Sequence, residues 1–182
     1  PTRDQIEKFQ NDIREESLVD EDLKQIFKSF PKSAHPMGVL SSLTSALIAF
    51  NPQNETKISL NDKEGITADD KMYLSTVRLL AKFPIMSSWT LRKIKGLPLN
   101  YSNNNLSYTE NIAYMMFAKP NQEYIQNDII VNALNTLLIL HADHEQNCST
   151  STVRIVGSSY AGLYASISAG ISALWGRLHG GA

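Results

Sequence analysis

The fold is decided by residues 161–175, which read AGLYASISAGISALW. Uncharged, mostly apolar or small side chains fill the whole segment, so a helix formed from it has no charged face. A helix that is apolar on all sides is normally surrounded by other elements. We therefore expect residues 161–175 to form a central, fully surrounded helix.

A second segment of the same kind precedes it in the chain. Residues 37–50 read MGVLSSLTSALIAF and are again apolar or small at almost every position. Because the residue before a proline avoids the helical region, His35 is expected to be extended before Pro36, with the helix after it. The many Gly, Ala and Ser residues in both segments allow each helix to pack closely, axis to axis, against a neighbouring helix.

Most of the remaining chain repeats apolar residues at helical spacing. The predicted helices cover 3–15, a segment from 19–22 to Pro31, a segment from Thr67 to Pro84, 86–95, 109–118, a segment capped by Asn127 or Asp128, and 149–155. After the cap at Asn127 or Asp128, the residues expected to face inward are Ile129, Ile130, Ala133, Leu134, Leu137 and Leu138. Residues 51–65 and 96–105 are rich in turn formers and are expected to be loops. Since no stretch shows sustained strand-like alternation, the predicted fold class is all-α and multi-helical.

The composition excludes several kinds of partner. The 17 basic and 18 acidic residues give a net charge of −1, which provides no overall field to attract nucleic acid or an anionic membrane. Cys148 is the single cysteine, which suits a reducing compartment. The first residues lack the layout of a signal peptide, and the longest weakly polar run falls short of a membrane span. These features predict a cytoplasmic protein.

The densest group of chemically active side chains lies at residues 140–154, which read LHADHEQNCSTSTVR. His141 and His144 are three positions apart, as in some metal sites, but no HExxH pattern accompanies them and no metal is predicted. In one interpretation, both histidines only satisfy hydrogen bonds in a polar seam. However, Asn147, Arg154 and the serines and threonines between them add many polar groups beside an apolar helix, and such groups need partners. A bound polar ligand is an economical partner for them.

A second group lies at residues 175–182, which read WGRLHGGA. The glycines around His179 permit a tight turn and the close approach of a ligand. If a helix follows, the dipole at its N-terminus favours a neutral imidazole that can donate a hydrogen bond to a developing enolate. A plain surface turn is the alternative. Separately, Arg78 and Lys82 form a small basic face that either meets a phosphate or is simply solvated.

Taken together, these stretches resemble the citrate synthase family, and within it the NADH-sensitive class of many bacteria. The resemblance is carried by residues 33–37 (SAHPM), 138–147 (LILHADHEQN), 149–154 (STSTVR), 157–159 (GSS) and 174–182 (LWGRLHGGA), and it spans essentially the whole chain. Two positions depart from the family pattern. Arg177 stands where a proline is common, and Gly162 stands where an asparagine is common, which removes a side-chain hydrogen bond at the start of the last helix.

The resemblance implies a reaction and a role for particular residues. The reaction is the condensation of oxaloacetate with acetyl-CoA to citrate and CoA through an enol, a step of the tricarboxylic acid cycle that needs no cofactor. By motif position, His179 would be the catalytic, enol-stabilising histidine, while His144 and Asn147 would bind oxaloacetate. Arg78 and Lys82 would be positions that bind NADH as an allosteric inhibitor.

The resemblance also implies an organisation. Residues 1–182 would be a helical part of the large domain of a homodimer or hexamer, with the N-terminal region, the small domain, a second histidine and an aspartate base lying elsewhere. We therefore expect this segment alone to be inactive. Two alternatives stay open: a 2-methylcitrate synthase, which uses propionyl-CoA, and a non-catalytic helical module for ligand binding or oligomerisation.

Overall fold

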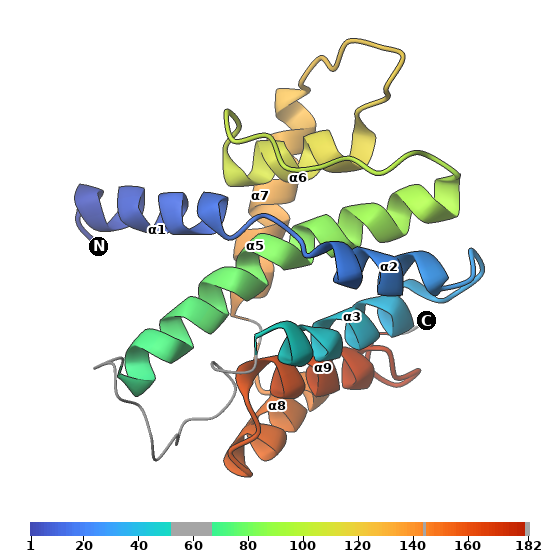
Figure 1. Ribbon diagram of the computed structural model, residues 1–182. Coiled ribbons are helices and arrows are strands. Elements are labelled where there is room, and N and C mark those ends of the chain that lie inside the picture. Colours follow the sequence, from blue (N-terminus) through green and yellow to red (C-terminus); the bar gives the residue numbers. More distant parts are fainter. Residues whose placement is uncertain (52–66, 144, 181–182) are drawn as a thin grey trace.

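The structure is a computed structural model that describes residues 1–51, 67–143 and 145–180. Within these ranges it contains helices and no strands, which confirms the all-α prediction. The helices are α1 (Arg3–Glu15), α2 (Glu21–Ser29), α3 (Pro36–Phe50), α5 (Ala68–Lys95), α6 (Tyr108–Phe117), α7 (Asp128–Ala142), α8 (Cys148–Ser158) and α9 (Leu163–Leu174). The long helix α5 crosses the molecule, with α1 and α6 on one side and α3, α8 and α9 on the other (Figure 1). In the part of the chain described, no helix is both long and apolar enough to cross a membrane.

Most helices begin close to where the sequence predicts, because capping residues satisfy their first backbone N–H groups. Thr2 and Gln5 form the predicted capping box of α1, and Thr67 and Asp70 form that of α5. Asn127 caps α7 through its side-chain oxygen. The loop predicted at 96–105 is confirmed, whereas the one predicted at 51–65 lies outside the described residues except for Asn51.

The core forms where α3 packs between α5 and α9. Leu43 and Leu47 of α3 are fully buried, in one cluster with Trp89 of α5 and Tyr164 of α9. Fully burying one aliphatic side chain of this kind contributes about 1.5–3 kcal/mol. This cluster therefore holds the three helices together and fixes α9, which leads into the turn that carries His179.

The two segments of small residues pack against each other, and the close axis-to-axis packing that their small residues allow is present. The hydroxyl of Ser41 on α3 lies 3.0 Å from the Ser168 carbonyl oxygen and 2.7 Å from the Ser172 hydroxyl, both on α9. On the opposite side of α9, a Cβ atom added to Gly170 would lie only 2.5 Å from Cγ2 of Val153 on α8. Glycine at this position is thus required for α8 and α9 to pack as they do.

The prediction that a helix ends at Pro84 and another starts at residue 86 is wrong, because α5 runs through Pro84 without interruption. Proline has no N–H, so the carbonyl of Leu80, four residues earlier, loses its helical partner. The hydroxyl of Tyr108 on α6 donates to that carbonyl at 2.9 Å. A side chain from another helix thus replaces the missing donor.

The predicted inward face of α7 is also wrong for the described structure. Among the residues expected to point inward, Ile129 is 81% exposed and Leu137 is 52% exposed, and no residue of α7 is buried. The reason is that α6 is the main neighbour of α7 among the described helices. The helix α9 is likewise not fully surrounded, since only Tyr164, Ser166, Gly170 and Ile171 are buried in it.

Candidate functional site

Asn147 begins α8 and organises its first turn. Its side-chain oxygen accepts hydrogen bonds from the Thr150 N–H at 3.0 Å and the Ser149 hydroxyl at 2.8 Å. A cap of this kind satisfies backbone donors that have no partner within the helix. The amide of Asn147 therefore has a fixed orientation at the positive end of the α8 dipole.

His179 lies against the same helix N-terminus, although it belongs to the turn after α9. Its Nε2 atom accepts from the Ser149 N–H at 3.3 Å and lies 3.0 Å from the Ser149 hydroxyl. Because a backbone N–H can only donate, Nε2 is the acceptor nitrogen and the proton of the neutral ring is on Nδ1. The structure therefore brings His179 and Asn147 together through Ser149.

The turn that carries His179 is as tight as its glycines suggested. The His179 N–H donates to the Gly176 carbonyl oxygen at 2.9 Å. A Cβ atom on Gly180 would lie 2.9 Å from Cδ1 of Leu174 and 3.0 Å from its carbonyl oxygen. A larger residue at Gly180 would push the turn away from α9 and would move the imidazole. Arg177, one of the departures from the family pattern, is exposed on this turn.

An aromatic contact that the sequence analysis missed supports this turn. The imidazole of His35 stacks on the indole of Trp175, with ring centroids 4.8 Å apart and an angle of 18° between the planes. His35 is extended, as predicted, and its Nδ1 accepts from the Met37 N–H at 3.2 Å, which caps α3. The Trp175 ring also lies 3.4 Å from where a Cβ on Gly38 would be. Only the family motifs hinted at either residue, since no local spacing connects positions so far apart.

The histidine-rich stretch is only partly helical. α7 ends at Ala142, Asp143 is extended, and Glu145 has a φ of 61°. Asp143 and Glu145 therefore do not continue the helical face that carries His141. His141 lies in the last turn of α7, where its Nδ1 contacts the Leu137 carbonyl oxygen at 2.7 Å. His144 lies outside the described residues, so its predicted role stays a prediction.

A positive φ in a residue other than glycine is uncommon and is often found near functional sites. Glu145 adopts this conformation between the end of α7 and Asn147. The departure at Gly162 also has the predicted effect, since Gly162 is the N-cap of α9 and makes no side-chain capping bond. Compared with Asn, Gly at an N-cap costs a few tenths of a kcal/mol.

The basic face of Arg78 and Lys82 lies on α5, against the end of α1. Arg78 Nε donates to a carboxylate oxygen of Glu16 at 3.0 Å. Lys82 Nζ donates to the Glu16 backbone carbonyl at 2.6 Å and lies 3.5 Å from its carboxylate. Burial lowers the pKa of Lys82, and the charge of Glu16 opposes that shift. Both cations thus have a counterion within the chain.

Comparison with known sequences identifies the family of this chain. A family model described as "Citrate synthase, C-terminal domain" matches residues 1–182. Citrate synthase 1 of Mycobacterium tuberculosis is 46% identical over 182 residues, which are 100% of this chain and 40% of the relative. Citrate synthase of Corynebacterium glutamicum is 46% identical over 187 residues, with the same shares of the two chains.

Solved structures agree with the sequence comparison. The crystal structure of citrate synthase from Pyrobaculum aerophilum has a TM-score of 0.87 and 28% identity, and the match covers 100% of this chain and 44% of that one. Citrate synthase from Thermotoga maritima has a TM-score of 0.75 at 24% identity, covering 100% and 42%, and it supports the fold alone. The chain thus spans 40% of the length of each of the two sequence relatives.

Proposed function

Because the chain belongs to the citrate synthase family, we propose that it forms part of an enzyme that condenses oxaloacetate with acetyl-CoA to give citrate and CoA. The family model matches the chain from end to end, and the 46% identity with the Mycobacterium tuberculosis enzyme also extends over the whole chain. The single observation that carries the proposal is the contact of His179 with the N-terminus of α8. The same contact gives the imidazole a defined tautomer, which the chemistry requires.

In the proposed mechanism, His179 stabilises the enol of acetyl-CoA. The Ser149 N–H occupies Nε2 and leaves the Nδ1 proton free to be donated to the thioester oxygen. When the methyl group loses a proton, negative charge develops on that oxygen, and a preorganised donor stabilises the charge. A carboxylate elsewhere in the complete protein would accept the methyl proton.

We assign oxaloacetate to the neighbouring space at the start of α8. The substrate is a dianion, and a helix N-terminus favours negative charge. Asn147 lies at this helix N-terminus, and its amide has a fixed orientation because its oxygen accepts hydrogen bonds from Ser149 and Thr150. His144, three residues earlier in the sequence, completes this proposed binding group.

Release of the CoA thiol by the complete protein tests the proposal. With oxaloacetate and acetyl-CoA, His179→Ala is expected to lower kcat by about 10²–10³-fold, as for the loss of one donor to a developing oxyanion. Asn147→Ala is expected to raise the KM for oxaloacetate, and its melting temperature must be measured because the cap is lost as well. Ser158→Ala, at the far end of α8, is the control and should not change kcat.

Retention of the wild-type kcat by His179→Ala would exclude the proposed role of this residue.

The same assay tests which acyl-CoA the enzyme uses. A higher kcat/KM with propionyl-CoA than with acetyl-CoA would favour 2-methylcitrate synthesis, and no thiol release with either substrate would favour the non-catalytic module.

We also propose that NADH, if it inhibits the enzyme, binds through Arg78 and Lys82. The proposal rests on the family resemblance and on the proximity of the two cations. Because Glu16 already pairs with Arg78, a nucleotide phosphate must compete with an internal carboxylate. Glu16→Gln is therefore expected to increase inhibition by NADH, and Arg78→Gln to abolish it. Equal inhibition of both variants and the wild type would place NADH elsewhere.

The proposed assembly is a homodimer or hexamer in the cytoplasm. The family resemblance supports the assembly, and a single cysteine, Cys148, in 182 residues is in keeping with a reducing compartment. Light scattering on the complete protein would determine the number of subunits.

A further inference from the structure

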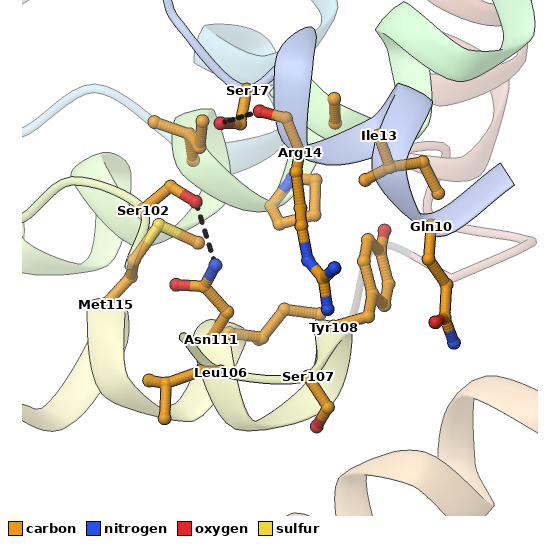
Figure 2. A pocket seen from close by; sticks show the side chains of 14 residues that line it. Gln10, Ile13, Arg14, Ser17, Ser102, Leu106, Ser107, Tyr108, Asn111 and Met115 are labelled. Atoms are coloured by element: carbon orange, nitrogen blue, oxygen red, sulfur yellow. Dashed lines mark hydrogen bonds between the residues drawn. The ribbon is translucent and has the colours of Figure 1, made fainter. Parts of the chain in front are cut away.

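A cavity separate from the site above lies between α1, α5 and α6. Its volume is about 100 Å³. Figure 2 shows side chains from α1, from the loop before α6 and from α6 itself around this space. A single water needs about 10–15 Å³ by this measure, so the cavity has room for several waters or for a small organic molecule.

Most of the lining is apolar. Its apolar members are Ile13, Ala81, Pro84, Ile85, Leu106, Ile112 and Met115. No aspartate or glutamate is among the lining residues. Three carboxylates near them in sequence are already engaged: Asp12 by Lys8 and Tyr73, Glu16 by Arg78, and Glu110 by the Ser107 N–H. Glu15, next to Arg14, is exposed and does not line the cavity.

One cation reaches over this apolar space. The Arg14 side chain extends across the cavity between Asn111 and Tyr108 in the view of Figure 2. Within the described residues, its guanidinium donates to the Asn11 side chain at 3.1 Å and forms no ion pair. An arginine carries five N–H donors, so most of them can still bind an anion.

One hydroxyl group adds a further donor to the cavity. Ser102 accepts a hydrogen bond from the Asn111 amide at 2.8 Å, so it can still donate its own proton. Tyr108 contributes its ring but not its proton, because its hydroxyl already donates to the Leu80 carbonyl. The cavity thus combines an apolar floor, an arginine and a hydroxyl donor, with no lining carboxylate to repel a negative charge.

We propose that this cavity is a binding site for a small amphipathic carboxylate, with its apolar body against Pro84, Ile85 and Met115 and its carboxylate on Arg14. The apolar body would displace water from the floor of the cavity. Arginine forms charge-assisted bonds to carboxylates, frequently bidentate. The site would be distinct from the substrate site, since it lies across α5 from α8 and α9 (Figure 1).

Octanoate is the probe, and its binding to the complete protein is measured by isothermal titration calorimetry. A dissociation constant of about 0.1–1 mM is expected for a ligand of this size. Two related molecules separate the two parts of the proposal. 1-Octanol has the body without the charge, and acetate has the charge without the body. Both should bind more weakly than octanoate, and only octanoate should weaken markedly as salt is added.

Two variants with a matched control locate the ligand. Arg14→Gln should weaken octanoate about five-fold, the effect of losing an accessible ion pair, and should leave 1-octanol unchanged. Arg3→Gln removes the same charge from the same helix, but Arg3 pairs with Glu7 outside the cavity, so it should have no effect. Ile13→Phe reduces the space and should weaken both octanoate and 1-octanol. Because Arg14 and Arg3 are both exposed, these substitutions should leave the melting temperature unchanged.

Three results would overturn the proposal. The first is no binding of octanoate at a concentration 10-fold above the expected dissociation constant. The second is equal affinity for octanoate and 1-octanol, and the third is an equal loss of octanoate affinity in Arg14→Gln and Arg3→Gln. The first would mean that the cavity is filled or closed in the complete protein. None of these measurements uses enzymatic activity, so their failure is separate from failure of the proposed function.

Discussion

Replacing Tyr108 by phenylalanine removes the hydroxyl that donates to the Leu80 carbonyl at 2.9 Å. That carbonyl has no helical donor because Pro84 lacks an N–H, so the substitution leaves it without a partner in the protein. Leaving a polar group of this kind unsatisfied costs about 1–3 kcal/mol when it is fully buried. Since Tyr108 is partly exposed, we expect a loss of about 1–2 kcal/mol in the free energy of unfolding.

Tyr108→Phe, Pro84→Ala and the double variant together form a double-mutant cycle. Alanine restores the N–H at position 84, which can donate to Leu80 within the helix. In that background Tyr108→Phe should cost only about 0.5 kcal/mol, which gives a coupling of about 1 kcal/mol between the two positions. Effects of Pro84→Ala on the unfolded chain cancel in the cycle.

The assay is urea unfolding followed by circular dichroism, with amide hydrogen exchange across α5 as a local readout. Exchange should speed up for α5 in Tyr108→Phe and return towards the wild-type rate in the double variant. If Tyr108→Phe costs as much in the Pro84→Ala background as in the wild type, the hydroxyl does not act through the Leu80 carbonyl and the explanation of the continuous helix is wrong.

The same hydroxyl predicts a dependence on pH. Burial raises the pKa of Tyr108 to about 12. An unperturbed tyrosine titrates near pH 10, so between about pH 10 and 12 the unfolded state has lost a proton that the folded state keeps. The difference in pKa between the folded and unfolded states therefore stabilises the folded protein fully below about pH 10, and this stabilisation is lost as the pH rises towards 12. Tyr108→Phe should lack this part of the alkaline loss of stability, and an unchanged alkaline profile would contradict the assignment.

Three other substitutions test the packing by thermal and urea denaturation. Gly170→Ala should cost about 1–3 kcal/mol because its Cβ would meet Val153, and Val153→Ala should recover part of that loss; no recovery would exclude this clash. Gly96→Ala should cost about 1 kcal/mol because Gly96 ends α5 with a φ of 70°, while Gly96→Asn should cost less; equal costs would contradict the backbone explanation. Arg92→Met should cost about 3 kcal/mol, because the buried Arg92 guanidinium donates to backbone carbonyls of the loop after α5 and of the end of α6; a loss below about 1 kcal/mol would show that water replaces it.

Helix positions could be predicted from the sequence wherever local chemistry decides them. The capping boxes at Thr2 and Thr67 and the cap at Asn127 place three helix starts correctly, because a cap needs only residues two or three positions away. Pro84 defeated the same reasoning, because the donor that keeps α5 continuous comes from Tyr108 on another helix. The outward face of α7 could not be predicted either, since an apolar pattern indicates that a face is suited to burial but not what covers it.

The candidate site divides in the same way. Motifs singled out His179 and Asn147, and the glycines predicted the tight turn that carries His179. The contact that joins the two residues depends on Ser149, 30 positions from His179, and no local pattern encodes a contact across that separation. The stack of His35 on Trp175 is of the same kind. Residue types can thus be read from the sequence, whereas their mutual orientation depends on how α8 and α9 pack.

Trp175, which stacks on His35 beside the turn, can be distinguished by fluorescence from the other tryptophan of the chain. The sequence contains two tryptophans: Trp89 is 1% exposed in the core, whereas Trp175 is 44% exposed. A water-soluble quencher such as iodide can therefore reach Trp175 and not Trp89. The quenchable part of the emission comes from an indole four positions before His179, so movement of that turn on ligand binding can be followed by steady-state fluorescence without any attached label.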